Sequence, residues 1–196
     1  MKGMDSSPAA DRPTRNSERT RSAVLAAAAH AIVEKGTGVS LAYIAKAAGV
    51  SKGGLLHHFP TREDLLVALV DDANHKFREA VQRQLDLSEN SPGKMLRAYV
   101  RALCSGSDET IQYFTSAPVW AGIYEIPEVS ALTRADQEWW SEQFALDGLS
   151  ADRILVVRRA AEGLAAALAY GEESPGNVKA GRDLLLSLTQ GGTFRD

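Results

Sequence analysis

The chain has 196 residues, 44% of them hydrophobic, which is enough to bury the core of one or two small domains. Its single cysteine excludes an internal disulfide and any zinc site built on several cysteines. The net charge of −3 is unevenly distributed. Residues 1–62 carry nine Lys/Arg and four Asp/Glu, a net +5, and the remainder carries −8. This asymmetry is typical of a protein that presents one basic end to a polyanion.

The two ends of the chain predict unstructured segments. Residues 1–16 contain two prolines and few apolar side chains, which predicts a disordered N-terminal arm, and we expect a disordered tail at 191–196. The N-terminus lacks the apolar core of a signal peptide, and no apolar run approaches the roughly 18 residues of a membrane helix. We therefore expect a cytoplasmic protein with no membrane partner.

The first helix is predicted over residues 17–35, ending at Gly36. Two further short helices follow, joined by a tight turn. Ser40 and Ser51 are candidate N-caps of these helices, and Gly49 ends the first of them. The apolar positions have helical spacing: Leu41, Ile44, Ala45 and Ala48, then Leu55 and Phe59. This is the pattern of a helix-turn-helix, whose second helix enters the major groove of DNA.

Residues 27–66 carry a more specific pattern. They contain an alanine-rich helix, then EKG, S-L-x-x-I-A-x-x-A-G-V-S-K-G-x-L-x-x-H-F and T-R-E-D-L-L. This segment resembles the DNA-binding part of the tetracycline-repressor (TetR) family of bacterial transcription regulators. The chain departs from the family at Gly54 and Leu56, where relatives usually have Thr and Tyr that contact DNA phosphates. The resemblance implies a homodimer that binds operator DNA and is released by a small organic ligand.

The second short helix is the predicted recognition helix. If Leu55 and Phe59 face inward, a rotation of about 100° per residue places Gly53, Leu56 and His57 on the outer side. His57 is the best candidate for reading a base edge. The two glycines indicate either close approach of backbone to DNA or a frayed helix start. The predicted DNA contacts are Ser40, Tyr43, Lys46, Ser51, Lys52, Gly53, Leu56, His57, Thr61 and Arg62. Arg12, Arg15, Arg19 and Arg21 either extend this contact or are simply solvated.

The rest of the chain also predicts helices. A loose capping box at Thr61 opens a long helix to about residue 85, and Pro92 is expected at the first position of the next helix. Further helices are predicted over 127–146, 150–171 and from 175 onward. No segment shows convincing strand alternation. The predicted fold is therefore all-α. A three-helix DNA-binding domain at 17–62 precedes a helical domain at 63–190 for ligand binding and dimerisation.

The last two predicted helices carry stripes of small and apolar residues. Such stripes pack either within one subunit or in the four-helix bundle of a dimer, and the resemblance implies the dimer. The predicted interface residues are Ala160, Leu164, Ala167, Leu168, Leu184, Leu185 and Leu188.

Aromatic residues gather in the middle of the helical domain, among prolines that break its helices. They indicate either an aromatic core or a ligand pocket, and the resemblance favours the pocket. Its predicted lining is Tyr113, Phe114, Trp120, Tyr124 and Trp140. All four histidines lie in the first 75 residues, so we expect an apolar or aromatic organic ligand rather than a metal.

Motifs of phosphate-binding loops, hydrolase nucleophiles and zinc proteases are absent from the sequence. We therefore expect neither an enzyme nor a bound metal or cofactor. The leading hypothesis is a ligand-responsive repressor that binds a palindromic operator. Two alternatives stay open: an architectural DNA-binding protein without effector, and an enzyme or small-molecule carrier with a helix-turn-helix-like segment.

Overall fold

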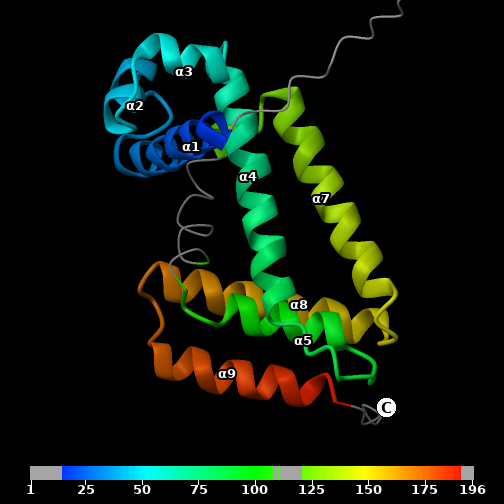
Figure 1. Cartoon of the computed structure of the whole chain (residues 1–196). Coiled ribbons are helices and arrows are strands. Elements are labelled where there is room, and N and C mark those ends of the chain that lie inside the picture. Colours follow the sequence, from blue (N-terminus) through cyan, green and yellow to red (C-terminus); the bar gives the residue numbers. More distant parts are fainter. Residues whose placement is uncertain (1–14, 108–109, 111–120, 191–196) are drawn as a thin grey trace, which may run out of the picture.

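The computed structural model describes residues 15–107, 110 and 121–190, and the regular elements in these ranges are helical (Figure 1). They are α1 (Arg15–Lys35), α2 (Leu41–Ala47), α3 (Lys52–His58), α4 (Arg62–Arg83), α5 (Lys94–Leu103), the 3-10 helix η1 (Ala121–Ile123), α7 (Pro127–Ala145), α8 (Ala151–Ala169) and α9 (Pro175–Leu188). The predicted all-α class is confirmed. None of the described helices is long and apolar enough to cross a bilayer.

The helix α4 connects two groups of helices. At its N-terminal end α4 packs on α1. The helices α1, α2 and α3 pack on one another, and we call these three helices the head (Figure 1). At its other end lie α5, α8 and α9, which pack on one another, and α7 runs beside α4 between the two groups. We call this second group, with α7 and the C-terminal part of α4, the body.

Local sequence signals position the helix starts as predicted. The Ser40 hydroxyl accepts a hydrogen bond from the Tyr43 backbone N–H at 3.2 Å, and Ser51 accepts one from Gly54 at 3.0 Å. Thr61 and Asp64 form the complete capping box, each side chain accepting from the backbone N–H of the other. Gly49 adopts φ +69°, a left-handed conformation that glycine tolerates and that ends α2.

The buried apolar residues form two cores. The core of the head includes buried residues of α1, α2, α3 and the first half of α4 up to Val70. Ile123 of η1 and Val129 of α7 also belong to it. The core of the body begins at Phe77 and joins α5, α7, α8 and α9. The core of the head therefore extends beyond residue 62 into α4. The elements η1 and α7 also pack against this core.

Two predicted boundaries are wrong. The helix α1 begins at Arg15, so Arg15 and Asn16 are helical rather than part of a disordered arm. The remainder of the predicted arm, and the tail at 191–196, lie outside the described residues.

The helix α5 begins at Lys94 instead of Pro92, because its start is set by a distant residue. The backbone N–H of Gly93 donates to the Asp147 carbonyl at 2.7 Å, and the Asp147 carboxylate accepts from Met95 and Leu96 N–H at 2.9 and 2.8 Å. Gly93 has φ +89°, and a Cβ there would lie 2.7 Å from Arg97 Nη1. Asp147 therefore replaces a local cap, and Gly93 makes the turn possible.

Candidate nucleic-acid interface and ligand pocket

The helix α3 packs on the head through one side only. Leu55 and Phe59 are buried, while Lys52, Gly53 and His57 are exposed, as predicted from helical periodicity. Leu56 differs from the prediction, because it is half-buried and packs against the core of the head. The outer face of α3 therefore presents the Lys52 ammonium, the backbone at Gly53 and the His57 imidazole.

Both glycines lie inside α3 rather than before it. A Cβ added at Gly53 would meet only the Ser51 hydroxyl, at 3.9 Å. At Gly54 the same hydroxyl would lie at 3.3 Å, a tighter contact. Packing within the head therefore does not require glycine at position 53.

The predicted backbone contacts surround this face. Ser40, Tyr43 and Lys46 of α2 are exposed, as are Ser51 and Thr61 before α3 and α4. The hydroxyls of Ser40 and Ser51 already accept capping hydrogen bonds, and each retains its own hydrogen for donation to an anion.

Arg62 does not lie free beside these residues. It is half-buried, and its Nη1 donates to the Val39 carbonyl at 2.6 Å. Its Nη2 is buried without a hydrogen-bond partner among the described residues. Arg62 thus ties the start of α4 to the segment before α2, and a phosphate contact would require it to leave Val39.

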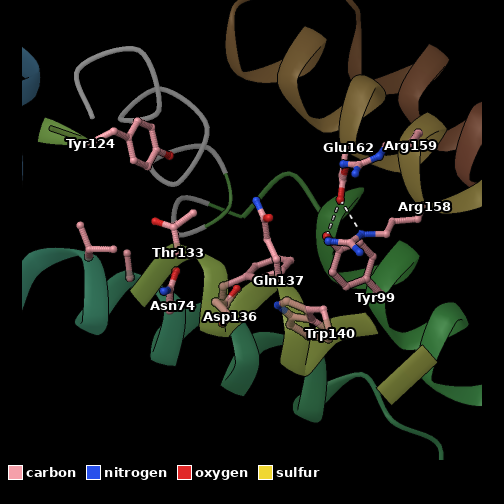
Figure 2. Close-up of a pocket in the computed structure, with 13 residues that line it drawn as sticks. Asn74, Tyr99, Tyr124, Thr133, Asp136, Gln137, Trp140, Arg158, Arg159 and Glu162 are labelled. Atoms are coloured by element: carbon pink, nitrogen blue, oxygen red, sulfur yellow. Dashed lines mark hydrogen bonds and ion pairs between the residues drawn. The ribbon is translucent and has the colours of Figure 1, made fainter. Parts of the chain in front are cut away.

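The body contains a cavity of about 240 Å³ between α4, α5, α7 and α8 (Figure 2). Its lining is Val70, Ala73, Asn74 and Phe77 of α4, Tyr99 of α5, Tyr124 after η1, Thr133, Asp136, Gln137 and Trp140 of α7, and Arg158, Arg159 and Glu162 of α8. Phe77, Tyr99 and Trp140 pack edge-on or tilted against one another, with ring centroids 4.9–5.7 Å apart. These rings form one apolar wall.

One end of the cavity is a network around Glu162. Its carboxylate accepts hydrogen bonds from Tyr99 Oη and Arg158 Nε, both at 2.9 Å, and from Arg159 Nη1 at 2.6 Å (Figure 2). Burial alone would lower the pKa of Arg158, but Tyr99 and Glu162 outweigh it and raise that pKa. Guanidinium groups stay protonated in proteins, so the two arginines place two positive charges at this end of the cavity.

The α4 and α7 walls contribute a second polar group. Arg78 donates to Asp136 Oδ1 through Nε at 2.8 Å and also through Nη2, and its guanidinium lies 4.2 Å from the Trp139 ring centre. Asn74 and Gln137 line the cavity without a side-chain hydrogen bond among the described residues. In Figure 2, Asn74 and Tyr124 lie at the end opposite Glu162, with Gln137 and Trp140 between.

The predicted lining is partly outside the described residues. Tyr124 and Trp140 do line the cavity, whereas Tyr113, Phe114 and Trp120 are not described. The wall is more polar than predicted, because α4, α7 and α8 contribute amides and charged groups that the aromatic pattern did not reveal. The i, i+4 spacing of Arg158 and Glu162 and the i, i+3 spacing of Arg159 and Glu162 were local signals for the charged groups of α8.

The predicted interface residues of α8 and α9 differ in how exposed they are. Leu184 is 61% exposed, but Leu185 is buried in the core of the body, and Leu164 packs against Gly181 within the subunit. Leu185 is therefore corrected to a core residue. Ala160, Ala167, Leu168 and Leu188 are half-buried. Exposed apolar side chains that the prediction missed are Leu155, Val156 and Tyr170.

The described residues contain no group of three His, Cys, Asp or Glu arranged to hold a metal ion. Cys104 is buried, and burial raises the pKa of its thiol to about 11 despite the opposing charge of Arg182.

Two segments match known families. Residues 24–69 match bacterial regulatory proteins of the tetR family, and residues 93–190, half of the chain, match the tetracyclin repressor-like C-terminal domain. The HTH-type transcriptional regulator BetI of Ectopseudomonas mendocina (strain ymp) is 33% identical over 125 residues, which are 59% of this chain. That alignment spans 61% of BetI's own length.

Solved structures share the fold. A TetR-family transcriptional regulator from Rhodococcus sp. has a TM-score of 0.70 at 18% identity, over 89% of this chain and 100% of the other. The multidrug binding protein EbrR, complexed with imidazole, has a TM-score of 0.63 at 21% identity, over 90% of this chain and 98% of its own. The first matched segment ends at residue 69, close to where the core of the head ends in α4.

Proposed function

The chain belongs to the TetR family of transcriptional regulators, and we propose that it is a dimeric repressor that a small organic ligand releases from a palindromic operator. The observation that carries this proposal is the unpacked outer face of α3, with Lys52, Gly53 and His57 exposed in a head of net positive charge. The protein would act in the cytoplasm, where bacterial chromosomal DNA lies.

Base reading is assigned to Lys52 and His57, because both lie on that outer face, Lys52 at the start of α3 and His57 in its last turn. Phosphate contacts are assigned to Ser40, Tyr43 and Lys46 on one side, and to Ser51 and Thr61 at helix N-termini. Arg62 is assigned a positioning role through Val39. These contacts position the head, and the two base readers supply sequence preference.

The ligand would act through α4. This helix contributes Leu66 and Val70 to the core of the head, and Val70, Asn74 and Phe77 to the cavity. A ligand that favours one position of α4 therefore also favours one position of the head. In a dimer, a small rotation of each α4 changes the spacing of the two recognition helices. EbrR, a multidrug binding protein with the same fold, has been solved in complexes with imidazole and with ethidium, and this supports a small-molecule site in the present chain.

The dimer would form through the exposed apolar side chains of α8 and α9. Leu155 and Val156 of α8, Tyr170 directly after it and Leu184 of α9 are each about half exposed or more. A second copy would cover them, and two-fold symmetry would give a palindromic operator with half-sites about one helical turn, or a multiple of it, apart.

The test begins with selection of bound fragments from the source genome, followed by fluorescence anisotropy on the selected site and on a scrambled duplex. Affinity should fall about 10³–10⁵-fold between 50 and 200 mM salt if the dimer neutralises 6–10 phosphates. His57→Ala should cost about 1–3 kcal/mol on the selected site and little on the scrambled one. The control is His75→Ala, an exposed histidine of α4 away from the head.

Equal affinity for selected and scrambled DNA would contradict the repressor. The architectural alternative predicts sequence-tolerant binding that no small molecule weakens.

A further inference from the structure

The chemical class of the ligand follows from the charge balance of the cavity, and this inference rests on the proposed function only in calling the ligand an effector. At the α8 end, one carboxylate, Glu162, pairs with two guanidinium groups, Arg158 and Arg159. Neither arginine has a second acidic partner among the described residues. The α8 end therefore has a surplus of one positive charge.

The carboxylate in the opposite wall does not offset this surplus. Asp136 is nearly buried and is neutralised by Arg78, which directs both of its donors at Oδ1. A cationic ligand would have to enter a cavity whose charges, with Arg78 included, sum to +1. An anionic ligand would instead meet the surplus guanidinium, in the geometry that favours Arg–carboxylate pairing.

The cavity volume is sufficient for about one ring. A cavity of about 150 Å³ accepts benzene, and this one measures about 240 Å³ and is partly open to solvent. Phe77, Tyr99 and Trp140 supply the aromatic surface on which such a ring would pack. A single substituted ring therefore fits the space and the wall.

Away from Glu162 the cavity can hold a polar group. The amides of half-buried Asn74, at the opposite end, and of exposed Gln137, between the two ends, line the cavity with no side-chain hydrogen bond among the described residues (Figure 2). Each amide offers both a donor and an acceptor. A ligand hydroxyl, amine or carbonyl on the side of the ring away from the α8 wall would satisfy them.

We propose that the effector is a small aromatic acid. Its carboxylate pairs with Arg158 and Arg159, its ring lies against Trp140, Phe77 and Tyr99, and a polar substituent reaches Asn74 and Gln137.

Three probes of one shape and different charge test the proposal: benzoate, benzamide and benzamidine. Binding to the full-length protein is followed by tryptophan fluorescence, since Trp140 lines the cavity, and by calorimetry up to about 10 mM. Benzoate should bind at least tenfold more tightly than benzamide or benzamidine, and 4-hydroxybenzoate at least as tightly as benzoate. Benzamidine as the tightest probe, equal affinities for all three, or no binding by any would overturn the proposal.

A matched pair of variants locates the carboxylate. Arg159→Gln should weaken benzoate at least fivefold and leave benzamide within twofold, because Arg159 is exposed and its removal leaves Glu162 paired with Arg158 and Tyr99. Arg134→Gln removes an exposed arginine of α7 that does not line the cavity. This variant should leave the affinity for both probes unchanged. Equal losses in the two variants would overturn the proposed binding mode.

Release of operator DNA is measured on the same samples, which separates the two proposals. Benzoate binding without release supports the ligand class and contradicts the repressor function. If benzamidine binds most tightly and releases the DNA, the proposed ligand class is overturned and the repressor function is supported.

Discussion

Gly53 is a residue at which stability of the fold and proposed DNA contact favour different side chains. Alanine is better than glycine in a helix by about 1 kcal/mol, and a Cβ at position 53 has open space in the head. Gly53→Ala should therefore raise the free energy of unfolding by up to about 1 kcal/mol. If backbone approaches DNA there, the same methyl group should weaken operator binding about tenfold. Urea unfolding and anisotropy measure the two effects.

Gly176→Ala is the matched control for Gly53. Both glycines follow a capping serine by two residues, and a Cβ at Gly176 would meet only the Ser174 hydroxyl, at 3.8 Å. Gly176→Ala should raise the free energy of unfolding by a similar amount and leave DNA affinity unchanged. Unchanged DNA affinity in Gly53→Ala as well would show that the backbone of α3 keeps its distance from the groove.

Cys104 makes stability depend on alkaline pH. Burial raises the pKa of its thiol from 9.0 to about 11 in the folded state. A raised folded pKa contributes stability that is fully present below the unfolded pKa and is lost as pH rises toward the folded pKa. The wild-type protein should lose about 1 kcal/mol relative to Cys104→Ala between pH 8 and pH 10. Urea unfolding of both proteins at each pH measures this difference in the free energy of unfolding. If that free energy changed with pH equally in the two proteins, the prediction would be contradicted.

Residues whose partners are near in sequence were predictable, and those with distant partners were not. The caps at Ser40, Ser51 and Thr61 use donors three residues away, so the sequence pattern located them. Arg62 was predicted to contact phosphate, and no local pattern indicated its hydrogen bond to the Val39 carbonyl, because Val39 is 23 residues away. Asp136 carried no signal for its pairing with Arg78, 58 residues before it.

The same distinction holds for whole elements. Helical periodicity predicted α2 and α3 closely, because an apolar stripe depends only on neighbouring residues. The start of α5 was missed, since Pro92 is a local start signal and Asp147 overrides it from another loop. The cavity was predicted in the right part of the chain, but its polar lining arises only where α4, α7 and α8 meet.

Arg97 joins three elements in the body. It is buried in α5 and donates to the carbonyls of Ser91 and Thr189, and it pairs with Glu89 at 2.7 Å. The loop after α4, the start of α5 and the end of α9 are thereby fixed together. Arg97→Met leaves Glu89 without its cationic partner and two carbonyls without this donor, so the free energy of unfolding should fall by about 3 kcal/mol.

The comparison for Arg97 is Arg101→Met, one helical turn further along α5. Arg101 is half-buried and has no hydrogen bond or ion pair among the described residues. Its replacement should change the free energy of unfolding by no more than about 0.5 kcal/mol. Denaturant unfolding compares the two, and equal effects would mean that Arg97 contributes through its alkyl chain alone.

At the scale of the whole molecule, α4 gives the head and the cavity a shared element. The core of the head reaches Val70, and Val70 also lines the cavity. A second route exists through Ile123 and Val129, which pack into the head a few residues from Tyr124 and Thr133 in the cavity wall. Ligand and DNA would therefore affect each other in both directions, and operator DNA should weaken ligand binding by the factor by which the ligand weakens DNA binding.

The exposed apolar face of α8 and α9 supports the last prediction. Leu184 is 61% exposed, so Leu184→Glu should leave the subunit folded while placing a charge in the proposed dimer interface. Sedimentation should show monomers. Binding to a palindromic operator should weaken about 10²–10⁴-fold, because each head then binds alone.

Leu87→Glu is the control for Leu184, since Leu87 is 85% exposed in the loop between α4 and α5 and belongs to neither α8 nor α9. It should remain dimeric and bind DNA like the wild type. Leu185→Glu is not an equivalent test, because Leu185 is buried in the core of the body and its replacement would unfold the subunit. A Leu184→Glu variant that sediments as a dimer would move the interface away from this face, and with it the spacing expected between operator half-sites.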